Sequence, residues 1–371
     1  MISNLLITTF VLIVLLIYGH KLSRRGTDDL LAIQSAHKRD TVRFGGVAII
    51  CGITAVCAAV CLVDLSLDIS MLILLSGLPI FLAGLLEDIT GKVRPRNRLL
   101  AAFCSAGLAV LLTGVYLEAG DFWFLNRLFI FPLIAIPITM LISSGIANAF
   151  NIIDGVNGFS AGIALIVSCV LGYVCQIYDE PNLSYFCYMI AVAIVPFLLV
   201  NFPFGYIFLG DAGAYTLGHL LSWVAIILMY RHPEISAWAI LLMFFWPATE
   251  TLLSIYRRFM SKTPSGAPDS FHFHQLIMQL ICLLFDRSDK MKRWANPIST
   301  VILLPLAGFS VVVSLFLIQN NKAAVLVFLV LVVSYLFSYV LLVRKVKSIA
   351  LRNGNSEVVN NLNYVFKPRR K

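Results

Sequence analysis

Charge is scarce in this sequence: only 13% of its 371 residues are Asp, Glu, Lys or Arg, whereas 60% are hydrophobic. A soluble domain is roughly half apolar and about one quarter charged, so this composition argues against a soluble protein. Strict alternation of apolar and polar residues is also missing, because the apolar residues form continuous runs. Continuous runs favour membrane-spanning helices over the strands of a membrane barrel.

The cysteines show no redox or zinc-binding pattern. Eight are present and none belongs to a CxxC pair. Because they fall in or near apolar segments, we interpret them as small core residues. An internal repeat and an aromatic-basic RNA signature are also missing from the sequence. We therefore expect neither a repeat protein nor a nucleic-acid partner.

Eleven apolar runs are long enough to cross about 30 Å of hydrocarbon as helices. We predict an all-α, polytopic integral membrane protein with about eleven transmembrane helices. The first run lacks a charged leader and a small-residue cleavage site, so we expect a retained helix rather than a signal peptide. The expected spans cover residues 2–19, 45–63, 70–86, 99–117, 128–146, 160–178, 185–202, 212–230, 236–255, 296–318 and 323–343.

Basic residues are distributed unevenly over the connections between these spans. All but three of the 28 Lys and Arg residues fall in the odd-numbered connections or the tail, the exceptions being Arg127, Arg231 and Lys322. Basic residues favour the cytoplasmic side, so we predict a periplasmic N-terminus and a cytoplasmic C-terminus. Topology and anionic lipid then account for most of the net charge of +9.

We expect residues 1–343 to form a single transmembrane domain and residues 344–371 to form a basic cytoplasmic tail. Polar residues gather in the connections of the predicted cytoplasmic face, which are residues 20–44, 87–98, 147–159, 201–211 and 256–295. Ionisable residues near hydrocarbon are costly, so a functional interpretation of these connections deserves weight.

Two of these connections carry carboxylates, one as an adjacent acidic pair and the other beside asparagine and glycine. Glu87 and Asp88 are adjacent at the end of an expected span. Neighbouring carboxylates repel unless a cation lies between them, and Mg²⁺ is an oxygen-seeking ion that also takes phosphates. In "ANAFNIIDGVNGFS", Asn151 and Asp154 are spaced to share a helical face, and Gly155 lets a ligand approach closely. A solvated helix end and a polar turn are the plain alternatives.

A third carboxylate, Asp211, lies between glycines where an expected span begins. A helix N-terminus offers unpaired N–H groups to an anion, and a carboxylate there can hold a metal ion against a phosphate. Phe208, just before it, can stack on a flat base. The alternative is an aspartate that caps the helix.

Basic side chains complete the set. His272 and His274 are two residues apart, a spacing that suits a transition metal or hydrogen bonds to phosphate. Lys38 and Arg43 precede two glycines and can meet a phosphate. Ordinary loop histidines and membrane anchors are the alternatives. All five motifs lie on the predicted cytoplasmic face, and together they provide the parts of a Mg²⁺–diphosphate site.

In these motifs the chain resembles the polyprenyl-phosphate N-acetylhexosamine-1-phosphate transferase family, which includes the phospho-MurNAc-pentapeptide translocase. The resemblance covers roughly residues 35–280. It implies that Asp211 and Asp88 bind Mg²⁺, with Mn²⁺ as a substitute, and that Asp88, Glu87, Asp154, His272 and His274 are catalytic. It further implies substrate binding by residues Lys38, Asn151, Asn157, Asn201 and Phe208.

The sequence departs from the family pattern in two acidic positions. Glu87 stands where the family usually has the first of two aspartates, which puts its role in doubt. Asn157 replaces the second aspartate of the family's NxxDGxDG motif and cannot act as a base.

The resemblance implies a Mg²⁺-dependent transferase of the bacterial inner membrane with its active site facing the cytoplasm. It would move an N-acetylated sugar-1-phosphate from a UDP-sugar to undecaprenyl phosphate, release UMP and start a lipid-linked glycan such as O-antigen, lipopolysaccharide or exopolysaccharide. The resemblance leaves open which sugar is transferred and whether the protein forms a homodimer. The alternatives are the pentapeptide translocase of peptidoglycan synthesis and, more remotely, a membrane transporter.

Overall fold

The computed structural model describes residues 1–19, 41–64, 68–118, 129–261, 271–285, 289–354 and 358–359. Within these residues the regular structure is helical, apart from one isolated parallel bridge between Val42 and Ile207. The predicted all-α fold is confirmed. The main helices are α1 (Ile2–Tyr18), α2 (Gly45–Asp64), α3 (Ile69–Ser76), α4 (Leu78–Thr90), α5 (Pro95–Thr113), α7 (Pro132–Ile152), α8 (Phe159–Ile177), α9 (Pro181–Asn201), α10 (Gly210–Arg231), α11 (Ala237–Met243), α12 (Phe245–Ser261), α13 (Phe273–Leu284), α14 (Asp289–Phe316) and α15 (Asn321–Arg352).

Each of the eleven expected spans coincides with one helix or with two consecutive helices. Among the described residues, seven helices are long and apolar enough to cross a membrane, or up to nine if each bent pair is one span. The two expected spans outside that count are α1, with 17 residues, and α5, which begins in a basic segment. The number eleven and the orientation of the termini stay predictions.

Two expected spans are bent rather than straight. α3 and α4 meet at 42° near Gly77, and α11 and α12 meet at 81° near Phe244. Pro247 lies in the first turn of α12, a position where its missing N–H costs nothing. The expected span over 236–255 is therefore two helices of different direction.

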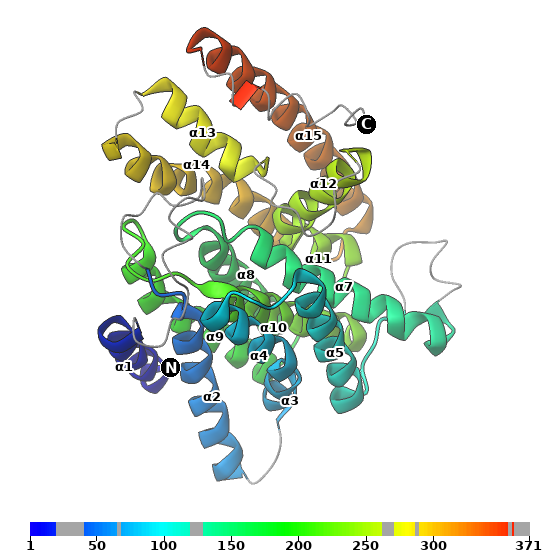
Figure 1. Cartoon of the computed structure of the whole chain (residues 1–371). Coiled ribbons are helices and arrows are strands. Elements are labelled where there is room, and N and C mark those ends of the chain that lie inside the picture. The colour runs from blue at the N-terminus through cyan, green and yellow to red at the C-terminus, as the bar shows by residue number, and fades with distance from the viewer. Residues whose placement is uncertain are drawn as a thin grey trace.

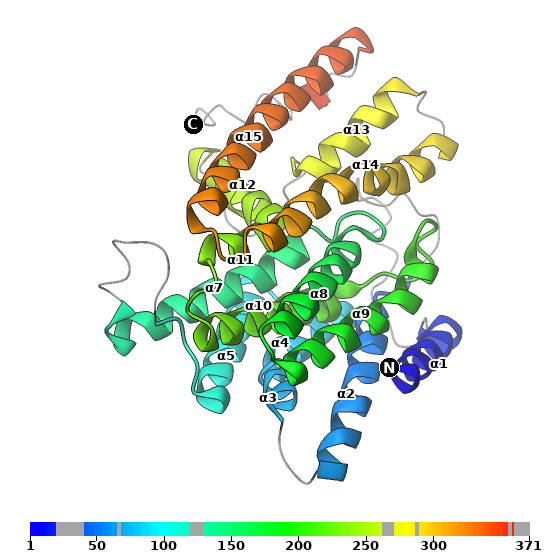
Figure 2. The ribbon, with the colours of Figure 1, turned by 180° about the vertical axis from the view of Figure 1, so that it is seen from behind.

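Helix α10 forms the centre of the bundle, and 94% of its most apolar stretch is buried. It contacts α7, α4, α2 and α8 (Figure 1). Small residues allow these contacts: Gly84 of α4 lies against the backbone of Ala212, and Gly218 lies against Ala147 of α7. Both views place α13, α14 and α15 together at one end of the molecule, away from α2 and α3 (Figure 2).

The start of α10 is fixed by a segment far away in the sequence. The Phe208 N–H donates to the Val42 carbonyl at 2.8 Å, and the Gly45 and Gly46 N–H groups donate to the carbonyls of Phe208 and Leu209 at 2.9 and 2.8 Å. These hydrogen bonds join the segment before α2 to the segment before α10. As a result, residues 42–46 lie beside the segment Phe208–Asp211.

Candidate functional site

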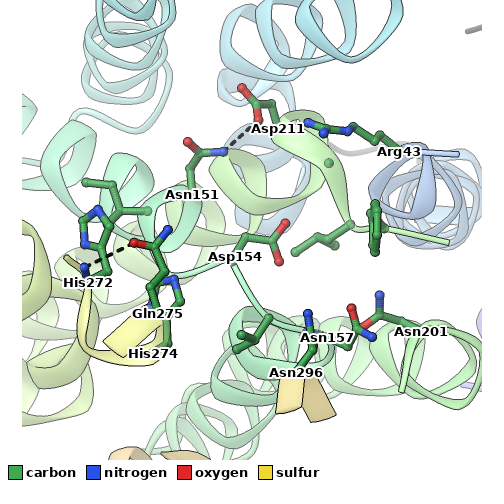
Figure 3. Close-up of a pocket in the computed structure, with 16 residues that line it drawn as sticks. Arg43, Asn151, Asp154, Asn157, Asn201, Asp211, His272, His274, Gln275 and Asn296 are labelled. Carbon is green, nitrogen blue, oxygen red and sulfur yellow. Dashed lines mark hydrogen bonds between the residues drawn. The ribbon is translucent and has the colours of Figure 1, made fainter. Parts of the chain in front are cut away.

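Six parts of the chain converge on a polar cavity of about 270 Å³ (Figure 3). Its walls come from the segment before α2, the end of α7, the turn after it, the connection between α9 and α10 with the helix ends on either side, the start of α13, and α14. Eight residues expected for catalysis or binding line it: Asn151, Asp154, Asn157, Asn201, Phe208, Asp211, His272 and His274. Motifs separated by more than one hundred residues therefore contribute to one site.

Three expected residues are not among the lining residues. Lys38 lies outside the described residues. The Glu87 carboxylate, 8% exposed, accepts a hydrogen bond from the Val93 N–H at 2.7 Å and so closes the turn between α4 and α5. Asp88 is 1% exposed and lies just behind the cavity wall. The expected roles, substrate binding for Lys38 and catalysis for Glu87 and Asp88, stay predictions.

Asp88 holds the beginning of α10. One of its carboxylate oxygens accepts from the Asp211 N–H and the other from the Ala212 N–H, each at 2.9 Å. These N–H groups belong to the first turn of α10, where backbone N–H groups have no hydrogen-bond partner within the helix. Gly210 allows Asp88 to approach closely. It has φ +76°, and a Cβ there would collide with the Arg43 carbonyl and with the Asp88 carboxylate. Asp88 thereby fixes the backbone that carries Asp211.

Two donors fix the side chain of Asp211. The Arg98 guanidinium pairs with one carboxylate oxygen, and the Asn151 amide donates to the other at 2.9 Å. Arg98 comes from α5 and Asn151 from the last turn of α7, so three helices meet at this carboxylate. Hydrogen-bonded carboxylates of this kind are typical of metal ligands, whose outer partners hold them in place.

Asp154 occupies the turn between α7 and α8 and points into the cavity (Figure 3). Burial raises the pKa of its carboxyl well above the ordinary value, and the nearby Asp211 and Asp88 carboxylates raise it further, whereas Arg43 opposes the shift. In the described part of the chain its carboxylate makes no hydrogen bond to protein. A cation bound between Asp154 and Asp211 would relieve this repulsion.

The two histidines stand on the opposite wall of the cavity. Their rings are stacked, with centroids 5.6 Å apart and an angle of 3° between the planes. His272 is the N-terminal cap of α13, and its N–H donates to the Gln275 side chain at 3.3 Å. Gly155 makes room for His274, because a Cβ there would collide with Nε2 of that ring.

Amide side chains line the remaining wall. Asn201 donates to the Ile207 carbonyl at 2.6 Å, while its Oδ1 is buried without a hydrogen-bond partner in the described residues. Asn157 donates from its side chain to the Pro203 carbonyl at 3.0 Å and from its backbone to Asn296 Oδ1 at 2.8 Å. Asn157 therefore joins the turn before α8 to two other segments.

The contacts of Asn157 predict the effect of restoring the aspartate that the family usually has. Asn157→Asp replaces an amide donor by an acceptor that faces the Pro203 carbonyl, at a site only 4% exposed. A buried unsatisfied acceptor costs about 1–3 kcal/mol, so we expect a lower thermal unfolding midpoint in detergent. Asn148→Asp is the matched control, because Asn148 accepts a hydrogen bond from Tyr215 and an aspartate still accepts it. Equal midpoints for the two variants would contradict the prediction.

Sequence reasoning missed four residues of this region. Arg98 was counted only among the basic residues that indicate the cytoplasmic face, and Gln275 and Asn296, which line the cavity, were not singled out. Glu250, a carboxylate inside an expected span, bonds to His272 Nδ1 at 3.0 Å. An isolated acid in an apolar run was an available signal for Glu250.

The donor set suits Mg²⁺ better than a transition metal. The described residues contain no group of three His, Cys, Asp or Glu side chains arranged to hold a metal ion. Mg²⁺ typically takes only one or two carboxylates and completes its shell with water and substrate phosphates. Asp211 and Asp154, both lining the cavity, fit that requirement.

Comparisons with known proteins agree with the site. The model of glycosyl transferase family 4 matches residues 70–229, which include Asp88, Asp154 and Asp211. A probable undecaprenyl-phosphate N-acetylglucosaminyl 1-phosphate transferase of Bacillus subtilis (strain 168) is 25% identical over 314 residues, covering 83% of this chain and 81% of the relative. An undecaprenyl-phosphate alpha-N-acetylglucosaminyl 1-phosphate transferase of Escherichia coli (strain K12) is 24% identical over 75% of this chain and 77% of the relative.

A similarity to the other branch of this chemistry is shorter. A phospho-N-acetylmuramoyl-pentapeptide-transferase of Clostridium perfringens (strain 13 / Type A) is 30% identical over 170 residues, covering 43% of this chain and 53% of the relative. The longer similarities are therefore to proteins named for N-acetylglucosaminyl 1-phosphate transfer.

Proposed function

Because the model of glycosyl transferase family 4 matches residues 70–229 and the long similarities are to N-acetylglucosaminyl 1-phosphate transferases, we propose that the chain is a member of this family. It would transfer an N-acetylated sugar-1-phosphate from a UDP-sugar to undecaprenyl phosphate and release UMP. The observation that carries this proposal is the single cavity in which Asp211, Asp154, His272 and Phe208 meet. These residues supply two carboxylates for a cation, an imidazole for phosphate and an aromatic ring for a base.

The chain is an integral membrane protein, as its apolar helices and its relatives indicate. We infer that the cavity lies at the cytoplasmic face of a bacterial inner membrane. The reason is that 25 of the 28 Lys and Arg residues of the chain lie in the connections and the tail predicted on that side. A site at this interface receives a soluble nucleotide sugar and a lipid phosphate together. The product, a polyprenyl-diphosphate sugar, would start a lipid-linked glycan such as O-antigen or an exopolysaccharide.

The reaction exchanges one phosphoanhydride for another. An oxygen of the lipid phosphate attacks the β-phosphorus, which carries the sugar-1-oxygen, and forms a new P–O–P bond. The bond between the β-phosphorus and the oxygen bridging to the α-phosphorus breaks, and UMP leaves with that oxygen. A phosphate monoester has its second pKa near 6, so a general base adds little and positioning should dominate.

The residues of the cavity have distinct tasks in this reaction. Asp211 and Asp154 would hold Mg²⁺, which neutralises charge on the diphosphate when bound. Arg43, His272 and His274 line the same cavity and donate hydrogen bonds to phosphate oxygens. Each of these residues therefore acts on the phosphate groups of the substrates.

Two further residues serve the nucleotide and the backbone. The Phe208 ring offers a stacking surface, and the unsatisfied Oδ1 of Asn201 accepts a hydrogen bond from the nucleotide or the sugar. Asp88 touches backbone N–H groups rather than the cavity, so we assign it to positioning Asp211.

A UMP-release assay in detergent tests the function. Purified protein receives undecaprenyl phosphate, MgCl₂ and one nucleotide from a panel: UDP-N-acetylglucosamine, UDP-N-acetylgalactosamine, a UDP-6-deoxy amino sugar, or UDP-MurNAc-pentapeptide. We expect release with an N-acetylhexosamine nucleotide, and none without lipid or with EDTA. A preference for the pentapeptide nucleotide would favour the peptidoglycan translocase, and no release with any donor would reject the transferase.

A further inference from the structure

An apolar groove begins where the polar cavity ends. It has a volume of about 910 Å³ and is lined by α8, the end of α9 and α14. α14 packs on α8, and α8 packs on α9, as the second view of the molecule shows (Figure 2). The function described so far gives this groove no role.

The cavity and the groove share a border on three segments of the chain. On each segment, a residue that lines the cavity is followed, directly or one turn later, by a residue that lines the groove. The pairs are Asn157 and Gly158 before α8, Asn201 and Phe202 at the end of α9, and Asn296 and Thr300 on α14. Hydrogen bonds run along this border, because the Thr300 hydroxyl donates to the Asn157 carbonyl at 2.6 Å and the Asn157 N–H donates to Asn296 Oδ1 at 2.8 Å. The polar cavity therefore changes into the apolar groove within about one helical turn.

The groove offers contacts to hydrocarbon and almost none to polar groups. Among the described residues that line it, Thr300 has the one polar side chain, and its hydroxyl already donates to the Asn157 carbonyl. Gly162 of α8 belongs to its floor, where a Cβ would lie 3.0 Å from the Leu304 side chain of α14. An occupant with hydrogen-bonding groups would lose its bonds to water here without replacement. The groove therefore suits a chain that has no polar groups.

The groove also has the depth of a membrane interior. It follows α14 from Thr300 to Val312, which is about 18 Å at roughly 1.5 Å per residue, more than half of the ~30 Å of hydrocarbon. Exposed rings of Phe204, Tyr206 and Trp294 form a cluster just before it, with 6.2 Å between the centroids of Phe204 and Trp294. Trp and Tyr gather at the level of the lipid headgroups. The sequence of aromatic cluster, polar cavity and apolar groove along α14 thus leads from the membrane surface into its interior.

The lipid substrate needs such a path. Its phosphate has to enter a cavity lined by carboxylates and amides, whereas its hydrocarbon chain has to leave that cavity for the bilayer. A membrane phospholipid or a second copy of the chain could also cover an apolar groove, but neither needs a connection to the cavity. The shared border therefore favours the chain of the substrate as the occupant.

We propose that the groove between α8, α9 and α14 binds the first isoprene units of the polyprenyl phosphate, while the phosphate lies in the cavity beside Asn157. The proposal rests on the proposed function for the identity of the lipid. It makes the border residues the point where headgroup and chain of the acceptor separate.

Filling the groove is the first test. Val301 lines the groove and is 61% exposed, so Val301→Trp adds bulk there without replacing a buried side chain. We expect the KM for undecaprenyl phosphate to rise by at least about tenfold, since even two buried methylene groups account for that factor. The KM for the UDP-sugar should not change, because the nucleotide binds in the polar cavity.

Leu306→Trp is the matched control, because Leu306 is 56% exposed on the same helix and does not line the groove. It should keep the wild-type KM for both substrates. An unchanged lipid KM in Val301→Trp, or an equal rise in both variants, would overturn the proposal.

Photo-crosslinking tests the groove without turnover. The photoreactive p-benzoylphenylalanine replaces Val301 or, as the control, Leu306, in protein placed in phosphatidylglycerol nanodiscs that contain undecaprenyl phosphate. Mass spectrometry then identifies the adducts. We expect undecaprenyl phosphate to be enriched over phosphatidylglycerol at position 301 and not at position 306.

At position 301, adducts that only follow the lipid composition, or a crosslink to a second copy of the chain, would overturn the proposal. If the wild type releases no UMP with any donor, the proposed function fails, while the crosslinks still decide whether the groove binds a polyprenyl chain.

Discussion

Asp211→Asn is expected to abolish Mg²⁺-dependent UMP release, with a loss of at least about 100-fold in kcat/KM. Even residues that only orient a metal ligand cost about 10- to 100-fold when removed, and Asp211 is a proposed ligand itself. Among the described residues, two carboxylates line the cavity, and the substitution removes one of them together with the ion pair of the Arg98 guanidinium. The measurement is initial rate against MgCl₂ concentration in detergent.

The control for this variant is Glu180, the residue just before α9, which pairs with Arg231 at the last turn of α10, where the pair is partly exposed. Glu180→Gln also removes a carboxylate that neutralises an arginine, but neither residue of this pair lines the cavity. We expect it to keep its Mg²⁺ response and most of its rate. A near-normal rate for Asp211→Asn at saturating Mg²⁺ would reject Asp211 as a metal ligand.

The sequence alone was sufficient to find most of the cavity. Asp154 and Asp211 were visible because each is an acid beside a glycine at the edge of a long apolar run, and Asn151 was visible as a polar residue three positions before Asp154. In such a chain a polar side chain near hydrocarbon needs a reason, so local context was enough to select them. The helical state of each run followed from its length, since a run long enough to cross a bilayer leaves little choice of secondary structure, but several helix ends differ from the expected ones by four residues or more.

What the sequence could not provide were the partners of each residue. Asp88 was expected to face the metal, but both of its oxygens bind N–H groups more than one hundred residues later in the chain. Arg98 was indistinguishable from the neighbouring basic residues that mark the cytoplasmic face. These contacts depend on how α4, α5 and α10 pack together, which no local pattern records.

The sequence also did not predict that the expected span over 236–255 is divided into two helices, α11 and α12. A hydropathy pattern reports the length of an apolar run but not its direction, so the 81° bend between α11 and α12 left no trace in it. Pro247 did mark the first turn of a new helix. The bend matters because α12 carries Glu250, whose partners lie on α13 and α15.

Gly46→Ala is expected to be strongly damaging although it changes no charged residue. Gly46 at the start of α2 lies against the Cα of Gly213 in the first turns of α10, and a Cβ at Gly46 would collide with that backbone. Neither backbone can yield cheaply, because the Gly46 N–H also donates to the Leu209 carbonyl at 2.8 Å. Overpacking costs about 1–3 kcal/mol and occasionally more, so the unfolding midpoint should fall.

The same displacement should also reduce activity, since Leu209 and Asp211 are moved together with the start of α10. We expect loss of UMP release in Gly46→Ala even at temperatures where the protein remains folded. Gly145→Ala is the matched control, because Gly145 lies within α7 and a Cβ there meets no other atom within 4 Å. Alanine favours a helix over glycine by about 1 kcal/mol, so this control should be as stable as the wild type or more so. Equal stability and activity in the two variants would mean that the α2–α10 contact does not hold Asp211 in place.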